Sequence, residues 1–257
     1  MTLVIEMKKM EIRQTKILEL LTERKKVDVN EFSQLLKVSQ VTIRKDLDLL
    51  EKKGLIIRAH GFATLNGQDD MNNRLAYHYD IKQKLAKLAC ELIEDGETIM
   101  IESGSCCALL AQEIAASKKD VTIISNSSFI ADYIRQYPQV RIILLGGEYQ
   151  KEAQVCVGPM TRKCVEAFFV DKFFIGADGF SKTSGFTGND YMRSETVRDM
   201  AKQAQHVIVI TESSKFQQVG LVNLLPTDQV SYVVTDQQIP LDSEDYLQSQ
   251  NITVKKV

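Results

Sequence analysis

The sequence predicts two domains: a small α+β domain of three helices and a short hairpin, followed by a larger α/β domain with a mostly parallel sheet. Three amphipathic helix patterns fill most of the first 55 residues. From residue 80 onward, apolar β-like runs alternate with helix patterns, which is typical of parallel α/β sheets. A polar stretch without periodicity separates the two patterns at residues 66–73. We therefore predict a first domain over residues 7–66, a linker over 67–79 and a second domain over 80–257.

The elements of the first domain are predicted from helix caps and apolar spacing. Asp28 and Glu31 have the spacing of a capping box, and Ile43, Leu47 and Leu50 recur at i, i+4 and i+7. In chain order we predict a helix over about 10–23, a two-turn helix after Asp28, a helix from Ser39 to Lys53, and strands over 55–58 and 62–65. The two strands and the turn between them form a wing beside a three-helix core.

The second domain is predicted to alternate strands with helices. The first helix of this domain covers about 80–93. The predicted strands are 98–101, 121–124, 140–145, 172–175, 207–211, 230–235 and 252–254. The predicted helices between them are 106–116, 129–136, 161–169 and 191–205. Small polar loops follow several strands, and open α/β sheets bind ligands at the carboxyl ends of their strands.

The composition is that of a folded protein without a membrane segment. The chain is 44% apolar and 26% charged, with 4 prolines in 257 residues, which argues against collagen-like and wholly disordered classes. No apolar run approaches the roughly 18 residues that span a bilayer, and residues 1–9 lack a signal-peptide pattern, so we expect a cytoplasmic location. The 5 cysteines lack C-x-x-C spacing and the 3 histidines are scattered, so we expect no metal site and no cofactor.

Charge is distributed unevenly between the two predicted domains. Residues 1–66 hold 13 Lys and Arg against 9 Asp and Glu, a net charge of +4, whereas the rest of the chain carries −6. A basic end favours nucleic-acid binding, although a solvated basic face gives the same bias. The motifs must decide between these interpretations.

The third helix has the residues of a DNA recognition helix. Polar and basic side chains are predicted on its face opposite the core: Ser39, Gln40, Thr42, Arg44 and Lys45. Gln40 and Arg44 suit base edges in the major groove, whereas the other three suit phosphates. Arg58 and His60 in the wing are predicted to reach the adjacent backbone or minor groove. The alternative is a small helical module that binds another protein.

Loops of the second domain suggest an anion site. Residues 102–106 (Glu-Ser-Gly-Ser-Cys) lie between a predicted strand and a helix, where backbone N–H groups can bind phosphate. Lys215 at another strand end supplies a positive charge to the same kind of ligand. A plain turn is the alternative for the Ser-Gly-Ser loop.

Residues 38–47 (Val-Ser-Gln-Val-Thr-Ile-Arg-Lys-Asp-Leu), together with 50–55 and 58–61, resemble the winged helix-turn-helix of the DeoR (GlpR-like) family of bacterial transcription regulators. The family usually has Thr-Ile-Arg-Arg-Asp-Leu and a wing of His-Gly-Gly-Ala. Here Lys45 replaces the second Arg and Phe62 replaces the second Gly. Lys45 keeps the charge without bidentate geometry, which favours a phosphate contact over a base contact.

The chain from residue 74 to 257 is similar to the sugar-phosphate sensor domain of the same family, whose fold is related to ribose-5-phosphate isomerase. Position by position, the resemblance implies these ligand-binding residues: Glu102, Ser103, Gly104, Ser105, Cys106, Ser125, Asn126, Gly146, Gly147, Asp178, Gly179, Asp190, Glu195 and Lys215. Glu102 and Glu212 stand where the family has Asp. Cys106 and Cys107 stand where Thr is usual, which suits a different or bulkier ligand.

Two alternatives concern chemistry at this site. Adjacent Cys106 and Cys107 at a helix N-terminus could form a redox sensor rather than pack or contact ligand. Asp178 and Glu195 could move protons in a sugar-phosphate isomerisation, but ligand binding or helix capping is the favoured interpretation, with no catalytic residues.

The sequence therefore predicts a DNA-binding transcription regulator, a repressor of carbohydrate-metabolism genes. Its expected partners are double-stranded operator DNA, a phosphorylated sugar or related metabolite, and further copies of itself in a dimer or tetramer. The alternatives are a sugar-phosphate isomerase-like enzyme with an accessory helical domain, and a helical adaptor fused to an enzyme-like scaffold.

Overall fold

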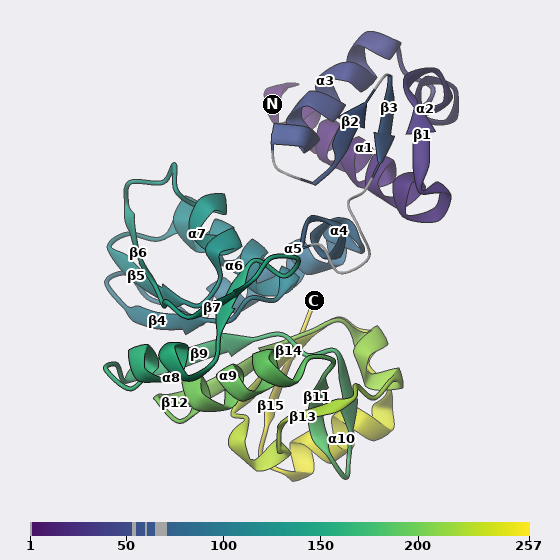
Figure 1. The fold of residues 1–257 in the computed structure, drawn as a ribbon. Coiled ribbons are helices and arrows are strands. Elements are labelled where there is room, and N and C mark those ends of the chain that lie inside the picture. The colour runs from purple at the N-terminus through teal and green to yellow at the C-terminus, as the bar shows by residue number, and fades with distance from the viewer. Residues whose placement is uncertain (1, 53–54, 60, 65–70) are drawn as a thin grey trace. The chain divides into compact units, whose positions relative to one another are not determined.

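A computed structural model describes residues 2–52, 55–59, 61–64 and 71–257. The chain divides into two compact units, Met1–Asp80 and Ile81–Val257 (Figure 1). The predicted fold class is confirmed, because the first unit is helical with a small sheet and the second has a seven-stranded parallel sheet.

Three helices form the core of the first unit: α1 (Thr2–Arg24), α2 (Val29–Leu36) and α3 (Gln40–Lys52). Asp28 caps α2 as predicted, because its carboxylate accepts hydrogen bonds from the backbone N–H groups of Asn30 and Glu31. The apolar faces of the three helices meet in a core that buries Ile17, Leu18, Leu21, Phe32, Ile43, Leu47 and Leu50.

The wing consists of β2 (Ile57–Ala59) and β3 (Phe62–Thr64), which pair antiparallel. A strand that the sequence analysis missed, β1 (Lys26–Asp28), pairs with the other edge of β3 and completes a three-stranded sheet. Three residues are too few to show an alternating pattern, so only the tertiary pairing reveals β1.

A helix lies inside the segment that we predicted as a linker. The helix α4 (Met71–Ala76) buries Met71 and Leu75 and contacts α1 within the first unit. The surrounding Asn and Asp residues conceal these two apolar side chains in the sequence. Residues 66–70 lie outside the described part of the chain.

All seven strands of the large sheet are parallel, in the order β15-β14-β12-β9-β4-β5-β6. They cover Thr98–Ile101 (β4), Val121–Ser125 (β5), Val140–Leu144 (β6), Val170–Ile175 (β9), Ala204–Ile210 (β12), Tyr232–Thr235 (β14) and Thr253–Lys256 (β15). From β4 the sheet continues to one side through β5 and β6, and from β9 it continues to the other side through β12, β14 and β15. The boundary between these two strands is therefore the topological switch point, where open α/β sheets bind ligands.

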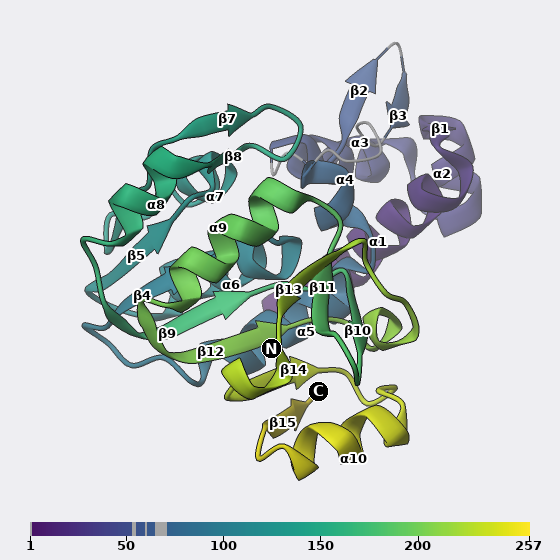
Figure 2. The same ribbon diagram turned by 60° about the horizontal axis from the view of Figure 1, so that its bottom comes forward.

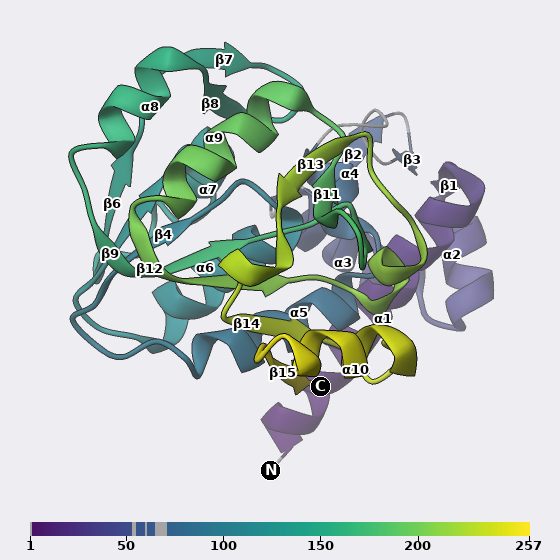
Figure 3. The same ribbon diagram turned by 90° about the horizontal axis from the view of Figure 1, so that it is seen from below.

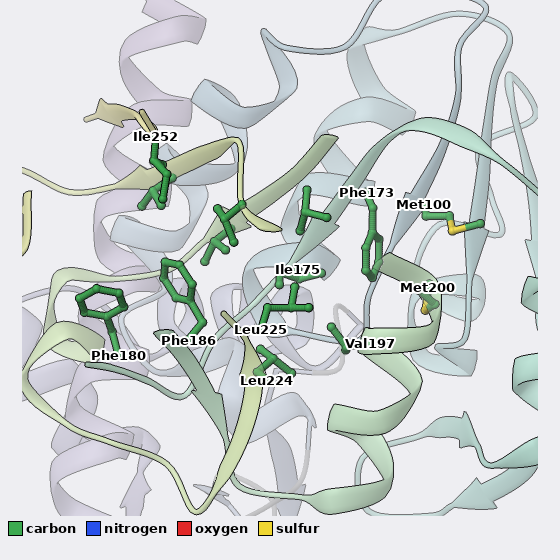
Figure 4. Packing of buried hydrophobic residues seen from close by; sticks show 14 of the residues in the cluster. Met100, Phe173, Ile175, Phe180, Phe186, Val197, Met200, Leu224, Leu225 and Ile252 are labelled. Atoms are coloured by element: carbon green, nitrogen blue, oxygen red, sulfur yellow. The ribbon is translucent and has the colours of Figure 1, made fainter. Parts of the chain in front are cut away.

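Helices cover both faces of the sheet. They are α5 (Tyr79–Cys90), α6 (Ser105–Ser117), α7 (Ser128–Tyr133), α8 (Pro159–Val165), α9 (Tyr191–Ala201) and α10 (Leu241–Ser249). Right-handed crossovers in opposite directions place α6 and α9 on opposite faces, as Figures 2 and 3 show. The face covered by α9 is packed by Phe173 and Ile175 of β9 against Val197 and Met200 (Figure 4).

Several short elements of the second unit escaped the sequence analysis. These are the hairpin of β7 (Glu148–Gln150) and β8 (Val155–Val157), the small sheet of β10 (Gly179–Ser181), β11 (Gly185–Gly188) and β13 (Val222–Leu225), and the helix α10. The helix α9 also ends at Ala201 rather than near Gln205, because Ala204 already belongs to β12. The extra strands are three or four residues long, too short for periodicity.

Candidate functional site

The first turn of α3 is organised by hydrogen bonds of its own polar residues. Ser39 Oγ accepts from the backbone N–H of Thr42 at 3.2 Å and lies 2.9 Å from Thr42 Oγ1. Gln40 donates from Nε2 to Oδ1 of Asn30 on α2 at 2.6 Å. The three residues predicted to contact DNA in this turn therefore also have structural contacts. Ser39 and Thr42 bind each other at the start of α3, and Gln40 binds α2.

Arg44 and Lys45 differ from these residues, because both are exposed on α3 and neither has a hydrogen bond or ion pair with the described residues. Two unneutralised cations thus lie side by side on one exposed face of the helix. Cations of this kind bind phosphate, and Arg also reads guanine.

The wing cation Arg58 is already paired. Its guanidinium forms an ion pair with Asp48 of α3, and its backbone N–H donates to Glu51 Oε1 at 3.1 Å. These contacts attach the wing to α3. His60, the other predicted wing contact, lies outside the described residues.

A buried ion pair that the sequence analysis missed fixes the orientation of α3. Asp46 is 1% exposed and accepts two hydrogen bonds from Arg13 of α1, including one from Nη2 to Oδ1 at 3.1 Å. The sequence did contain an indication of this pair. Asp46 falls on the predicted buried face of α3, and burying a carboxylate without a cation lowers the stability of the fold.

In the second unit, Glu102 and Gly176 meet at the switch point between β4 and β9. Glu102 Oε2 accepts hydrogen bonds from the backbone N–H groups of Gly104 at 2.8 Å and Gly176 at 3.3 Å. Glu102 Oε1 accepts from Ser103 Oγ at 2.8 Å. The Gly104 amide, which we predicted for an external anion, thus binds a carboxylate of the chain itself.

The rest of the loop after β4 is buried at the start of α6. Ser103, Ser105 and Cys106 are 2%, 7% and 7% exposed. Cys107 is fully buried and directs its thiol towards the carbonyl oxygen of Phe174, with Sγ 3.7 Å from it. These contacts account for Cys107 as a packed side chain.

Ser125 ends β5 and Asn126 follows it, and both lie beside the loop of Glu102 because Ser125 pairs in register with Ile101. Ser125 Oγ accepts from the backbone N–H of Ser127 at 3.1 Å. Asn126 donates from Nδ2 to the Cys156 carbonyl at 3.0 Å, whereas its buried Oδ1 has no hydrogen-bond partner in the described structure. A buried acceptor of this kind is open to a donor from a ligand or a water molecule.

A second buried ion pair was also missed. Lys82 of α5 lies 3.9 Å from Glu212 at the end of β12, and the two side chains are 5% and 4% exposed. Glu212 was noted in the sequence as a departure from Asp, but Lys82 carried no signal beyond its place in a helix pattern.

Lys215 lies in the short helix η1 (Ser213–Gln217) and is half-buried, without an ion pair among the described residues. Asp236 anchors this helix by accepting from the backbone N–H of Ser213 at 2.8 Å, and it also accepts from the backbone N–H of Gln238 in its own loop at 3.0 Å. Burial raises the pKa of Asp236, but these hydrogen bonds outweigh burial and hold the pKa below its ordinary value.

Asp178 and Gly179 lie where β10 begins. Asp178 Oδ2 accepts from the backbone N–H of Asn189 at 3.0 Å, which ties the loop to the end of β11. A Cβ at Gly179 would approach the Gln218 carbonyl oxygen to 2.5 Å. Close backbone packing therefore explains this glycine.

Asp190 and Glu195, at the start of α9, both have structural partners. Asp190 caps the helix by accepting from the backbone N–H of Arg193 at 2.8 Å. Glu195 lies 3.6 Å from Arg162 of α8, which also donates to Asp199 at 2.7 Å. Burial raises the pKa of Asp199, but hydrogen bonds from Lys202 and Arg162 lower it overall.

Gly146 and Gly147 follow β6 and contact α8. Thr161 Oγ1 donates to the Gly146 carbonyl at 2.9 Å, and a Cβ at Gly147 would come within 2.0 Å of the same Thr161 atom.

Of the predicted ligand-binding segments, the structure brings the loops after β4, β5 and β9 to one sheet edge. It gives Gly147, Gly179 and Asp190 packing or capping contacts of their own.

Other kinds of site are not seen in the described residues. They contain no group of three or more His, Cys, Asp or Glu side chains that could hold a metal ion, and no helix long and apolar enough to cross a membrane.

A groove of about 510 Å³ lies between α9 and β13. It is lined by residues such as Tyr191, Arg198 and Leu221 and by none of the predicted ligand-binding residues.

Comparison with known proteins assigns both units. A model described as a DeoR-like helix-turn-helix domain matches residues 13–69, and one described as a DeoR C terminal sensor domain matches residues 77–237. The chain is 28% identical over 248 residues to a putative aga operon transcriptional repressor of Escherichia coli O157:H7, covering 94% of this chain and 92% of the relative.

Two further similarities were found. The chain is 27% identical over 246 residues to the glycerol-3-phosphate regulon repressor of Escherichia coli K12, covering 95% of this chain and 97% of the relative. Ribose 5 phosphate isomerase A from Neisseria gonorrhoeae overlaps 52% of each chain, with 17% identity and a TM-score of 0.40. Because both domain models describe regulator domains, the isomerase alternative is wrong. The chain belongs to the DeoR family of transcription regulators, with its helix-turn-helix in the first unit and its sensor domain in the second.

Proposed function

We propose that this regulator is a cytoplasmic repressor of carbohydrate-metabolism genes, and that it releases operator DNA when the sensor domain binds a phosphorylated sugar or related metabolite. The observation that carries the DNA-binding part is the pair of cations, Arg44 and Lys45, which lie on the exposed face of α3 and have no ion pair among the described residues. The names of the aga operon and glycerol-3-phosphate regulon repressors support repression of sugar-related genes.

The proposed effector site is the sheet edge at the switch point. Asn126 Oδ1 offers a buried acceptor for a sugar hydroxyl, and Lys215 offers a cation for a phosphate. Because Glu102 already occupies the Gly104 and Gly176 amides, an anionic ligand must displace this carboxylate or bind beside it. This exchange of internal hydrogen bonds for ligand contacts is the proposed source of the conformational signal.

The regulator is proposed to act as a homo-oligomer, a dimer or a tetramer, so that two copies of α3 reach successive half-sites. A ligand-induced change in their spacing alters the affinity for the operator. A coupling free energy of about 1 to 3 kcal/mol changes that affinity by roughly 5- to 150-fold.

The test is a salt titration of the purified protein on its own upstream DNA, with and without a panel of sugar phosphates. Sequence-selective binding that one phosphate compound weakens supports both parts of the proposal. The Lys215→Ala variant should lose the ligand response and keep its ligand-free DNA affinity. Unchanged ligand affinity in this variant removes Lys215 from the site, and a lack of specific DNA binding contradicts the proposed repressor.

A further inference from the structure

The exposed face of α3 has an apolar side chain at its centre. A helix turns roughly 100° per residue, and the buried face of α3 is defined by Ile43, Asp46, Leu47 and Leu50. Val41 lies about 170° around the helix axis from the middle of this buried face. It is 61% exposed, in the first turn of the helix.

Folding gives no reason for a valine at this position. A β-branched side chain has a lower helix propensity than Ala, Gln or Lys, and an exposed one gains little from burial. Leu49, which lies later in α3 and on a different side of the helix, is less exposed, at 37%. A single exposed apolar residue is ordinary on a protein surface, so its surroundings decide what it can do.

The neighbours of Val41 are the two cations that have no partner in the described part of the chain. Arg44 and Lys45 are three and four positions further along the helix, and side chains at these spacings adjoin one another. By contrast, the amide of Gln40 is bound to Asn30, and the hydroxyl of Thr42 is bound to Ser39. In the first turn of α3, Val41 is therefore the most outward-directed side chain that is not bound to a polar partner.

We propose that Val41 is a specificity-determining residue that packs against the C5 methyl group of a thymine in the operator. The methyl group of thymine is an apolar group that no other base presents in the major groove, and apolar side chains distinguish thymine by contacting it. Arg44 and Lys45 bind the adjacent guanine or phosphates and so hold Val41 over the base. This inference rests on the proposed entry of α3 into the major groove.

The experiment uses the full-length protein and a duplex that it selects from a random pool. Each thymine of the duplex is replaced in turn by deoxyuridine, which removes the methyl group and keeps the hydrogen-bonding edge. The wild type should bind about three- to fivefold more weakly at the contacted position, the factor that corresponds to one buried methyl group. The Val41→Ala variant should bind the two duplexes equally at that position.

The Leu49→Ala variant is the matched control, because it also truncates an exposed apolar side chain of α3, and it should keep the wild-type preference for thymine. Circular dichroism and thermal unfolding should show both variants folded. If wild type binds every deoxyuridine duplex as tightly as the parent, or if Val41→Ala keeps the preference, the assignment of Val41 is wrong. The Arg44→Ala variant tests separately whether α3 enters the major groove. If this variant binds the operator more weakly, that proposal stands, whatever the result for Val41. If both Arg44→Ala and Val41→Ala bind as tightly as wild type, the proposed entry of α3 into the groove is wrong as well.

Discussion

The exposed face of α3 and the ligand edge of the sensor sheet satisfy their charged groups in opposite ways. On α3, Arg44 and Lys45 have no partner among the described residues. At the sensor edge, Glu102 binds two backbone amides of its own domain, and Lys82 is buried beside Glu212. The face of α3 presents cations to a polyanion, whereas the sensor edge already engages its Glu102 carboxylate in internal hydrogen bonds and leaves Asn126 Oδ1 and Lys215 for a ligand.

This difference matches the tasks of the two units. DNA binding gains from cations that need no rearrangement before they meet phosphate. A sensor gains from internal bonds that ligand binding can replace, because a ligand shifts a conformational equilibrium only through interactions that differ between the states.

Loss of the buried cation at the sensor edge should have the largest effect. The Lys82→Met variant removes the buried ammonium that lies 3.9 Å from the Glu212 carboxylate, and it should lower the free energy of unfolding of the second unit by about 3 to 5 kcal/mol. The exposed Lys45→Met variant should change stability by no more than about 0.5 kcal/mol. Urea unfolding followed by circular dichroism measures both.

A double variant separates the charge from the packing. Lys82→Met combined with Glu212→Leu removes both charges and should recover most of the lost stability. If the double variant is as unstable as the single one, packing of the lysine stem rather than the lost attraction between Lys82 and Glu212 causes the loss.

The two glycines after β6 should respond differently to alanine. In Gly147→Ala the new Cβ meets Thr161 Oγ1 at 2.0 Å and the Val157 carbonyl at 2.7 Å, so we expect a loss of about 2 to 3 kcal/mol. Gly146→Ala has open space around its Cβ and should be tolerated. Equal thermal unfolding temperatures for the two variants would contradict a packing role for Gly147.

On the DNA-binding side, Arg44→Ala should cost about 1 to 3 kcal/mol of operator binding if Arg44 reads a base, with little loss on random DNA. Lys45→Ala should weaken binding to both DNAs alike and reduce the slope of affinity against salt by about one. Fluorescence anisotropy at several salt concentrations measures both. An equal loss on the two DNAs for Arg44→Ala reassigns this residue to phosphate.

The anchor of η1 should show a pH-dependent effect of about 1 to 2 kcal/mol in Asp236→Ala, because two hydrogen bonds to a carboxylate are lost. The pKa of Asp236 is lower in the folded state, so its contribution to stability is present above the ordinary Asp value of about 4 and is lost as pH falls through the folded pKa. The difference between wild type and variant should therefore be largest near neutral pH and shrink under acid. A constant difference in thermal unfolding across pH 3 to 7 contradicts this role of the carboxylate.

Local sequence signals suffice to predict the two-unit organisation, the core helices α1 to α3 of the first unit and the seven strands of the main sheet. These features rest on local signals: the cap at Asp28, the apolar spacing of Ile43, Leu47 and Leu50, and apolar strands followed by small polar loops. Local signals of this kind involve residues within a few positions of one another, which one sequence displays directly.

Which polar groups already have partners depends on the tertiary structure. Glu102 and Gly176 are 74 positions apart, and Asn30 and Gln40 belong to different helices, so no local pattern joins them. The strand β1 and the helix α4 exist because they pair or pack with distant segments. Three-residue strands carry no period and long-range partners leave no spacing rule, so these contacts follow from the fold rather than from the sequence pattern.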